Sequence, residues 1–293
     1  MYEIKDGVLC LILSMHGVSL RNAVSTPKEA VDITAKAGFK SIELPVSTWN
    51  INPETVTKKD ITDIKNILKS GGVEASSLGM IWPAKYILVT SSTTEWKRNI
   101  NYATKLFDFS AALGVKVLNL GAGRHVPLNV EYIEGLKTQV RFWKEACEHA
   151  ENLGVIVAVE HTGRSHTSNV GNTTKELIDL VKAINSPSFQ INAQIQSMAI
   201  TDLDIPAAIR AMGSMIKLVH IGDVLGFNPI IDSVESMLPG KGKLDFIPIL
   251  KALKDVGYNG EICLEPSPPT LGKDIISELR ESRKFLEANW KQA

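Results

Sequence analysis

The stretch GVIVAVEH (residues 154–161) contains the unit that decides the fold: a glycine, a short run of aliphatic residues and a polar end. Short runs rich in Val, Ile and Leu are typical of parallel strands that are buried on both faces. An amphipathic segment, residues 130–153, precedes this stretch, and another, residues 174–185, follows it. The sequence therefore predicts a strand that lies between two helices.

The same alternation recurs along all 293 residues. The apolar runs that predict strands are Val8–Met15, Ser41–Leu44, Val73–Leu78, Val115–Leu120, Ile156–Glu160, Phe189–Gln194, Ile216–Ile221 and Glu261–Glu265. The segments that predict helices are residues 27–37, 58–70, 93–113, 130–153, 174–185, 203–212, 246–256 and 272–289. A helix after every strand implies parallel pairing, and eight such units imply closure. We therefore expect a single (β/α)8 TIM barrel, with residues 1–293 as one domain.

A doubly wound open sheet is the alternative, but that fold does not require eight evenly spaced units. The joints between the predicted elements also favour repeated helix–strand units, since a glycine follows many helical segments and precedes the next strand. A helix commonly ends in a left-handed residue, a conformation that glycine adopts at little cost. These glycines are Gly38, Gly72, Gly114, Gly154 and Gly257.

Composition argues against several classes of protein. The 32 basic and 32 acidic residues cancel, and no local run of Lys and Arg indicates a nucleic-acid partner. Three cysteines without a CxxC pair argue against a disulfide framework or a structural zinc site. The apolar run Val8–Met15 is far shorter than the ~20 residues needed to cross a bilayer, so we expect a cytoplasmic protein without a membrane partner.

Polar residues follow the apolar runs of the last four predicted strands, at the end where such barrels carry their active sites. They are Glu160, Gln194, His220 and Glu265. Oxygen ligands with one imidazole nitrogen suit Mn²⁺, Mg²⁺, Co²⁺ or Zn²⁺. A single glutamate at a strand end is often only a salt-bridge partner, but three ligand types at three strand ends rarely align by chance. The sequence therefore predicts a divalent metal site at this end of the barrel.

The chain resembles the xylose-isomerase-like TIM-barrel family, which includes sugar epimerases, keto-inositol isomerases and dehydratases, and hydroxypyruvate isomerases. The resemblance covers most of the chain, and it is the order and spacing of its motifs that make it specific. The motifs are Ile42-Glu43-Leu44, Val159-Glu160-His161, Val219-His220-Ile221-Gly222-Asp223, the run Pro239–Phe246, and Leu264-Glu265.

The resemblance implies a ligand set of Glu, Asp, His and Glu from strands five to eight. Carried over, these ligands are Glu160, Gln194, His220 and Glu265. Gln194 is a departure, because the family's Asp-x-x-His reads Gln-Ile-Gln-Ser at residues 194–197. An amide carbonyl can bind a hard cation but brings no negative charge, so we expect a weaker metal site. Ser197 stands where the family has a histidine that contacts substrate.

The chemistry that such a site supports is proton transfer next to a carbonyl. A cation that touches a carbonyl and an adjacent hydroxyl polarises the C=O bond and stabilises an enediolate. Returning the proton to the opposite face epimerises a carbon, returning it to the neighbouring carbon isomerises the sugar, and loss of a β-hydroxyl dehydrates it. Glu160 and Glu265 are the predicted base and acid, as the resemblance to the epimerases implies.

Residues expected to contact a carbohydrate substrate are His16, Glu43, Trp82, Arg124, His161, Ser197 and Lys241. Several of them have an alternative role. Glu43 could instead pair with a basic residue of the barrel, His16 could pack under a loop, and Trp82 could be a buried structural residue rather than an apolar wall for sugar C–H groups. Arg164 and His166 are further candidates for binding an anionic group.

Three alternatives to a sugar isomerase or epimerase remain. A dehydratase acting on a keto-inositol-like substrate would use the same site, and a non-catalytic sugar-binding barrel would explain Gln194 and Ser197. An abasic-site endonuclease shares this barrel but requires a zinc cluster and more histidines than the six here. Dimers and tetramers are common among similar proteins, so a homo-oligomer is also open.

Overall fold

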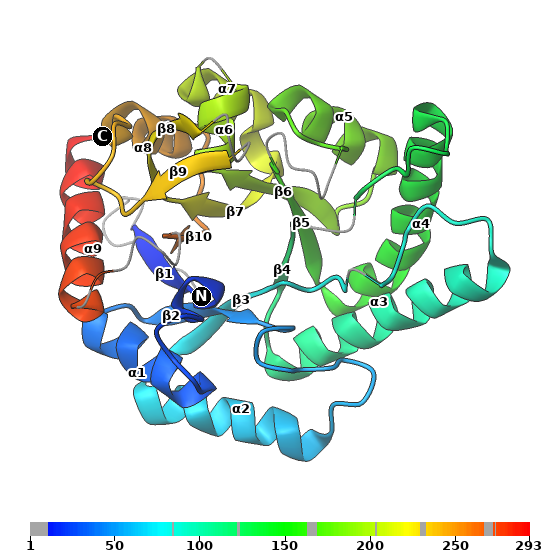
Figure 1. Cartoon of the computed structure of the whole chain (residues 1–293), viewed down its shortest axis with the longest axis horizontal. Coiled ribbons are helices and arrows are strands. Elements are labelled where there is room, and N and C mark those ends of the chain that lie inside the picture. Colours follow the sequence, from blue (N-terminus) through cyan, green and yellow to red (C-terminus); the bar gives the residue numbers. More distant parts are fainter. Residues whose placement is uncertain are drawn as a thin grey trace.

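The computed structural model describes residues 11–83, 85–121, 124–162, 169–202, 204–228, 233–266, 272 and 274–293. Its centre is a closed parallel barrel with the strand order β1-β10-β7-β6-β5-β4-β3-β2 (Figure 1). The strands are β1 (Ile12–His16), β2 (Ser41–Pro45), β3 (Glu74–Gly79), β4 (Val117–Leu120), β5 (Ile156–Glu160), β6 (Phe189–Gln194), β7 (Ile216–Ile221) and β10 (Glu261–Leu264). The predicted (β/α)8 barrel is confirmed. The first predicted strand began at Val8, and residues 8–10 lie outside the described part.

Helices surround the barrel, as Figure 1 shows. They are α1 (Pro27–Ala37), α2 (Lys58–Gly71), α3 (Thr93–Leu113), α4 (Tyr132–Leu153), α5 (Thr174–Ile184), α7 (Ile205–Met212), α8 (Phe246–Asp255) and α9 (Ile275–Gln292). Thr26 and Thr57 begin α1 and α2 with capping boxes, which satisfy backbone N–H groups that a helix leaves free at its start. None of the helices in the described residues is long and apolar enough to span a membrane.

Some short elements in the loops of the barrel were not predicted from the sequence. A short helix, α6 (Ile195–Thr201), follows β6 directly, and a one-turn helix, η1 (Gly17–Leu20), follows β1. An antiparallel hairpin of β8 (Asp223–Asn228) and β9 (Ser233–Met237) follows β7. A second one-turn helix, η2 (Gly213–Met215), precedes β7. The helices η1 and α6 and the hairpin therefore lie at the carboxyl end of the barrel, in the loops that follow β1, β6 and β7.

The Pro239–Phe246 run has a structural role that centres on Asp223. The Asp223 carboxylate is buried and accepts hydrogen bonds from the backbone N–H groups of Val224, Gly240, Gly242 and Leu244 at 2.8–3.1 Å. A Cβ atom on Gly242 would lie 2.3 Å from the carboxylate, so only glycine allows this approach. The run is a loop folded around one carboxylate, and it fixes the base of the β8–β9 hairpin.

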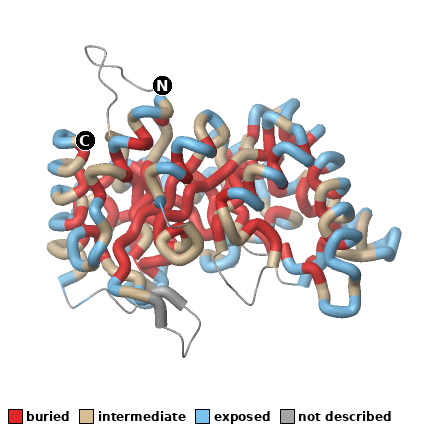
Figure 2. Tube along the Cα trace, turned by 90° about the horizontal axis from the view of Figure 1, so that it is seen from above, coloured by how far each residue is buried: buried red, intermediate tan, exposed pale blue. Residues whose placement is uncertain are grey.

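Buried residues run through the middle of the molecule, and exposed residues gather on the surrounding helices (Figure 2). Inside the barrel, Ala158, Leu218 and Cys263 form a small buried apolar cluster. Each lies two positions before a polar residue, and residues two apart on a strand face the same side. The apolar cluster is therefore the layer directly beneath the side chains that follow it: Glu160, His220 and Glu265.

Candidate active site

A cavity of about 340 Å³ opens at the carboxyl end of the barrel strands. Catalytic groups of TIM barrels lie at this end. The residues that line it are His16, Val18, Arg21, Met80, Ile81, Trp82, Asn119, Gly121, Glu160, His161, Thr162, Gln194, Ser197 and Glu265. Aliphatic and aromatic side chains from the β1 and β3 loops form one part of the wall, and polar side chains from β4, β5, β6 and β10 form another. Such a mixture suits a ligand with both C–H faces and hydroxyl groups.

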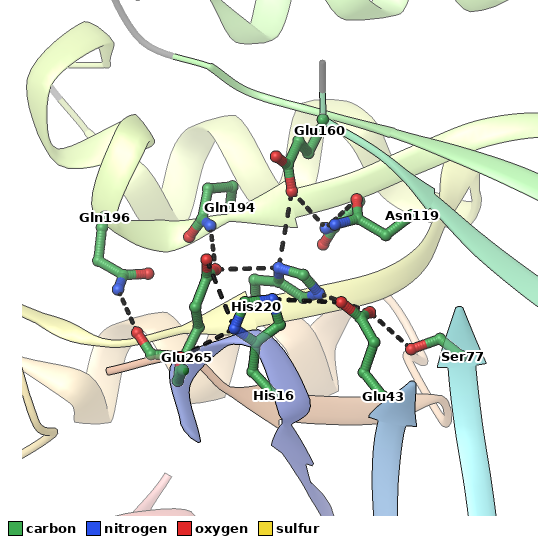
Figure 3. A network of polar contacts seen from close by, with 12 residues as sticks. His16, Glu43, Ser77, Asn119, Glu160, Gln194, Gln196, His220 and Glu265 are labelled. Atoms are coloured by element: carbon green, nitrogen blue, oxygen red, sulfur yellow. Dashed lines mark hydrogen bonds and ion pairs between the residues drawn. The ribbon is translucent and has the colours of Figure 1, made fainter. Parts of the chain in front are cut away.

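His220 is the centre of the polar network beneath this cavity (Figure 3). Its side chain is fully buried, and its Nδ1 atom lies 3.0 Å from Oε2 of Glu265 and 3.6 Å from Oε2 of Glu160. Its other ring nitrogen, Nε2, lies 3.1 Å from Oε2 of Glu43. Nδ1 of His220 therefore faces Glu160 and Glu265, and Nε2 faces Glu43.

Gln194, from the end of β6, joins this network through its amide. Its Nε2 donates to Oε2 of Glu265, while its Oε1 is buried and has no hydrogen-bond partner among the described residues. The structure thus brings together the four residues predicted as metal ligands, with Gln194 in the register expected from the sequence. An amide oxygen without a donor is available to a cation.

Gln196 holds the backbone around the same site. Its Nε2 donates to the carbonyl oxygen of Glu265 at 2.7 Å and to Oγ of Ser236 in β9 at 3.0 Å. It therefore links α6, the end of β10 and the unpredicted hairpin. Together with the hydrogen bond from the backbone N–H of Glu265 to the carbonyl oxygen of Ile221, this link holds the Glu265 backbone in place.

Glycines make room for the side chains of Glu160 and Glu43. A Cβ atom at Gly121 would lie 2.2 Å from Oε1 of Glu160, and one at Gly79 would lie 2.2 Å from Oε1 of Glu43. Sequence reasoning missed both roles. Their signal is positional, because each glycine directly follows or ends the strand next to the one that carries the glutamate.

The pKa values of the two carboxylates that line the cavity, Glu160 and Glu265, are shifted in opposite directions. Burial opposes ionisation of Glu265, but the charges of His16 and His220 outweigh it and lower the pKa of Glu265 to about 2. For Glu160, burial outweighs the attraction of His220, and the nearby charge of Glu265 adds to burial, so its pKa is raised. Burial also opposes a charge on His220, but Glu43 and Glu265 raise its pKa well above the usual value. Two carboxyl groups with pKa values pushed apart can serve as acid and base.

Asparagine side chains support Glu160, and the sequence did not single them out. Asn192 donates to Oε2 of Glu160 at 3.2 Å and to Oδ1 of Asn119 at 3.0 Å. Asn192 is fully buried on β6, two positions before Gln194. Because it shares the inward face with Gln194, strand periodicity could have identified it.

Four of the predicted substrate-binding residues lie on the cavity wall. They are His16, Trp82, His161 and Ser197. Trp82 also packs edge-on against Tyr102, with ring centroids 5.3 Å apart, so this residue both lines the cavity and belongs to a buried aromatic cluster. Burial lowers the pKa of His161 to about 3, and this neutral ring contacts Thr174 at 2.9 Å.

The other three predicted substrate-binding residues do not line the cavity. Arg124 is fully buried, and its guanidinium donates to the carbonyl oxygens of Gly121 and Glu160. Lys241 is on the surface, with its Nζ 3.3 Å from Glu281. Glu43 is buried behind His220, where it contacts histidines rather than a lysine or arginine. Arg164 and His166 lie outside the described residues.

Around His220, two sets of described side chains are candidates to hold a divalent cation, and both include His220. One set is Glu160, Gln194, His220 and Glu265, and the other is His16, Glu43 and His220, whose ligand atoms lie within 4.8 Å of one another. A neutral imidazole has only one free lone pair, so His220 can serve one set at a time. In the first set, all ligands except His220 line the cavity. A catalytic cation must reach substrate, so the first set fits it better.

Comparisons with known proteins match most of the chain. A family model described as xylose isomerase-like TIM barrel matches residues 31–289. A D-psicose 3-epimerase of Enterocloster bolteae is 24% identical over 257 residues, which are 85% of this chain and 80% of the relative. An inosose isomerase of Bacillus velezensis is 23% identical over 271 residues, 90% of this chain and 92% of the relative.

Solved structures share the fold. A crystal structure of D-psicose 3-epimerase from Clostridium cellulolyticum H10 with D-tagatose superposes with a TM-score of 0.81 and 19% identity, covering 96% of this chain and 99% of that one. At the level of class, the prediction of an enzyme among sugar isomerases and epimerases is confirmed by the sequence relatives. The match over residues 31–289 shows that the chain belongs to the family of xylose isomerase-like TIM barrels.

Proposed function

We propose that this protein is a metal-dependent epimerase that inverts a hydroxyl-bearing carbon next to the carbonyl of a small ketose. The observation that carries the proposal is the meeting of Glu160 and Glu265 at Nδ1 of His220, on the cavity side of the barrel. The carboxylates come from β5 and from the end of β10, so they approach the cavity from different strands (Figure 3). Two carboxylates on different sides of one substrate carbon are what inversion by proton transfer requires.

The same residues fit a divalent cation. Glu160 and Glu265 supply carboxylate oxygens, His220 supplies Nδ1, and Gln194 supplies a buried amide oxygen that no described donor occupies. A divalent cation held there would polarise the ketose carbonyl and stabilise negative charge on its oxygen. This donor set carries two negative charges, so a bound divalent cation leaves it neutral, and we expect weaker metal binding than with three carboxylates.

In the proposed reaction, one glutamate removes the proton from the carbon next to the carbonyl and the other returns a proton to the opposite face. Asn192 and Asn119 hold Glu160 in place for this transfer, and Gln194 holds Glu265. Trp82 and Ile81 exclude water along the apolar wall, while His16, His161 and Ser197 bind substrate hydroxyl groups. Fixed geometry of this kind accelerates proton transfer because the reacting groups need no further alignment.

Isotope exchange tests the proposal directly. The protein is loaded with Mn²⁺ or Co²⁺ and incubated in D2O with free ketohexoses, a ketopentose 5-phosphate and an inosose. The expected result is a C-3 epimer of one ketose with deuterium at the inverted carbon, detected by NMR. Glu160→Gln and Glu265→Gln should each abolish the exchange, while Glu261→Gln, at the opposite end of the barrel, should retain it. No deuterium uptake from any of these substrates would overturn the proposal.

A sugar-binding barrel without turnover is the second candidate, and Gln194 favours it because the amide removes one charge from the metal site. This candidate predicts that calorimetry detects ketose binding by the purified protein. It also predicts that the purified protein contains less than one equivalent of divalent metal. Elemental analysis of the protein after purification separates the two candidates. If the metal-loaded protein introduces deuterium from the solvent into a ketose, the sugar-binding barrel without turnover is excluded.

A further inference from the structure

Behind His220, Glu43 is a carboxylate with no exposed surface. Its Oε2 lies 3.1 Å from Nε2 of His220 and accepts a hydrogen bond of 2.7 Å from Ser77. Its Oε1 lies 3.3 Å from Nε2 of His16. The cavity wall includes His16 but not Glu43. Any effect of Glu43 on chemistry therefore passes through another side chain.

When a divalent cation replaces the hydrogen on Nδ1 of His220, the contact with Glu43 determines where the remaining ring hydrogen lies. An ionised carboxylate can only accept hydrogen bonds, so the favourable arrangement places a proton on Nε2, directed at Glu43. A neutral ring with hydrogen on Nε2 has its free lone pair on Nδ1. Nδ1 is the atom that faces Glu160 and Glu265.

The carboxylate of Glu43 is held on several sides. Ser77 lies opposite Glu43 in the register of β2 and β3, where the pairing shifts just before Glu43. Gly79 leaves the space for Oε1, because a Cβ atom there would come within 2.2 Å of it. The site that orients His220 therefore involves three residues of β2 and β3, and none of them belongs to the ligand set of the proposed function, which is Glu160, Gln194, His220 and Glu265.

We infer that Glu43 is a positioning residue that keeps the hydrogen of His220 on Nε2 and so directs Nδ1 to a divalent cation. The inference rests on the metal site of the proposed function, but it is independent of which sugar is converted. A carboxylate behind a metal-binding histidine fixes the ring orientation and strengthens the ligand, and its loss commonly weakens metal binding about 10–100-fold.

The experiment uses the full-length protein with Glu43→Gln, which keeps the size of the side chain and removes its charge. Glu261→Gln is the matched control, because Glu261 is also a barrel glutamate that accepts from a serine, Ser41, but lies at the start of β10. Ser77→Ala is a milder variant that removes one support of Glu43. Co²⁺ affinity is measured by calorimetry, and the ring protons of His220 are followed by NMR in ¹⁵N-histidine protein loaded with Zn²⁺.

The inference expects Glu43→Gln to lower Co²⁺ affinity about 10–100-fold, with Ser77→Ala giving a smaller loss and Glu261→Gln none. The Nε2 proton of His220 should resonate downfield in the wild type, because its acceptor is charged, and should move upfield in Glu43→Gln. Equal Co²⁺ affinity of Glu43→Gln and Glu261→Gln, or an unchanged His220 resonance, would overturn the inference. If Glu43→Gln does not fold, wild-type affinity and an unchanged resonance in Ser77→Ala overturn it.

Failure of the inference is distinct from failure of the proposed function. Weaker Co²⁺ binding by Glu43→Gln in a protein that converts no ketose would support the positioning role and overturn the epimerase. If the wild type exchanges deuterium and the Glu43→Gln variant binds Co²⁺ normally, the epimerase is supported and the positioning role of Glu43 is overturned. A wild-type protein that binds no Co²⁺ would overturn both.

Discussion

Substituting Gly121 by alanine is expected to displace the Glu160 carboxylate while leaving the barrel folded. The new Cβ atom would lie 2.2 Å from Oε1 of Glu160, whereas ordinary contact begins at 3.4 Å, so the two atoms must separate by about 1.2 Å. The clashing atom is the end of a side chain, which can rotate away, so the cost to stability is small. A misplacement of about 1 Å at a catalytic group can lower the rate about 10²-fold.

The assay for Gly121→Ala is kcat/KM for the ketose that the wild type converts, together with Co²⁺ affinity and the melting temperature. Gly226→Ala is the control, because a Cβ atom at that position of β8 would meet no atom of the described residues within 4 Å. We expect Gly121→Ala to lose about 10²-fold in kcat/KM with little change in melting temperature, and Gly226→Ala to resemble the wild type. Wild-type kcat/KM in Gly121→Ala would refute the view that the position of Glu160 matters. A large fall in melting temperature would refute the view that only the side chain moves.

Three further predictions concern charge and stability. Gln194→Glu should raise Co²⁺ affinity measured by calorimetry, because it adds a carboxylate to the ligand set; unchanged affinity would contradict the position of Gln194 in this set. Asp223→Asn should lower the free energy of unfolding in urea by about 2–6 kcal/mol, because the amide leaves two of four backbone N–H groups facing its NH2 group, each costing about 1–3 kcal/mol; wild-type stability would contradict it. Burial raises the pKa of Glu261, so its ionisation opposes folding as pH rises above its unfolded pKa. Glu261→Gln should therefore gain melting temperature relative to the wild type between pH 4 and pH 7, and a difference that does not vary with pH would contradict this.

The sequence was sufficient for the barrel because each strand repeats one local pattern. A run such as Ile156–Glu160 is too short and too apolar for a surface helix, and α4 and α5 on either side have clear amphipathic spacing. The β8–β9 hairpin escaped prediction because Asp223 stabilises it through backbone N–H groups. Any residue except proline can supply a backbone N–H group, so these donors cannot be recognised from the sequence. Only the glycines that allow the close approach give a sequence signal.

The site could be predicted in part for the same reason. Glu160, Gln194, His220 and Glu265 each end or follow a strand, and the barrel brings strand ends together whatever lies between them. The role of Glu43 could not be read in this way. Its position near the end of β2 predicts a side chain at the mouth of the barrel. In the structure it lies beneath the cavity instead, where it contacts the ring of His220 and fills the space that Gly79 leaves. The position of the Glu43 side chain depends on how β2, β3 and β7 pack together, which the sequence of β2 alone does not reveal.

Gln194 and Glu43 have opposite effects on the charge around His220. Gln194 contributes a neutral amide where a third carboxylate would otherwise contact a cation, and it donates to Glu265. Glu43 places a negative charge one imidazole ring away from the same position. Coulomb attraction falls only in inverse proportion to distance, and screening is weak here because Glu43 and the ring of His220 are both fully buried. A carboxylate behind the histidine therefore still favours a cation on the other side of the ring, and it does so without occupying a coordination position that a substrate oxygen needs.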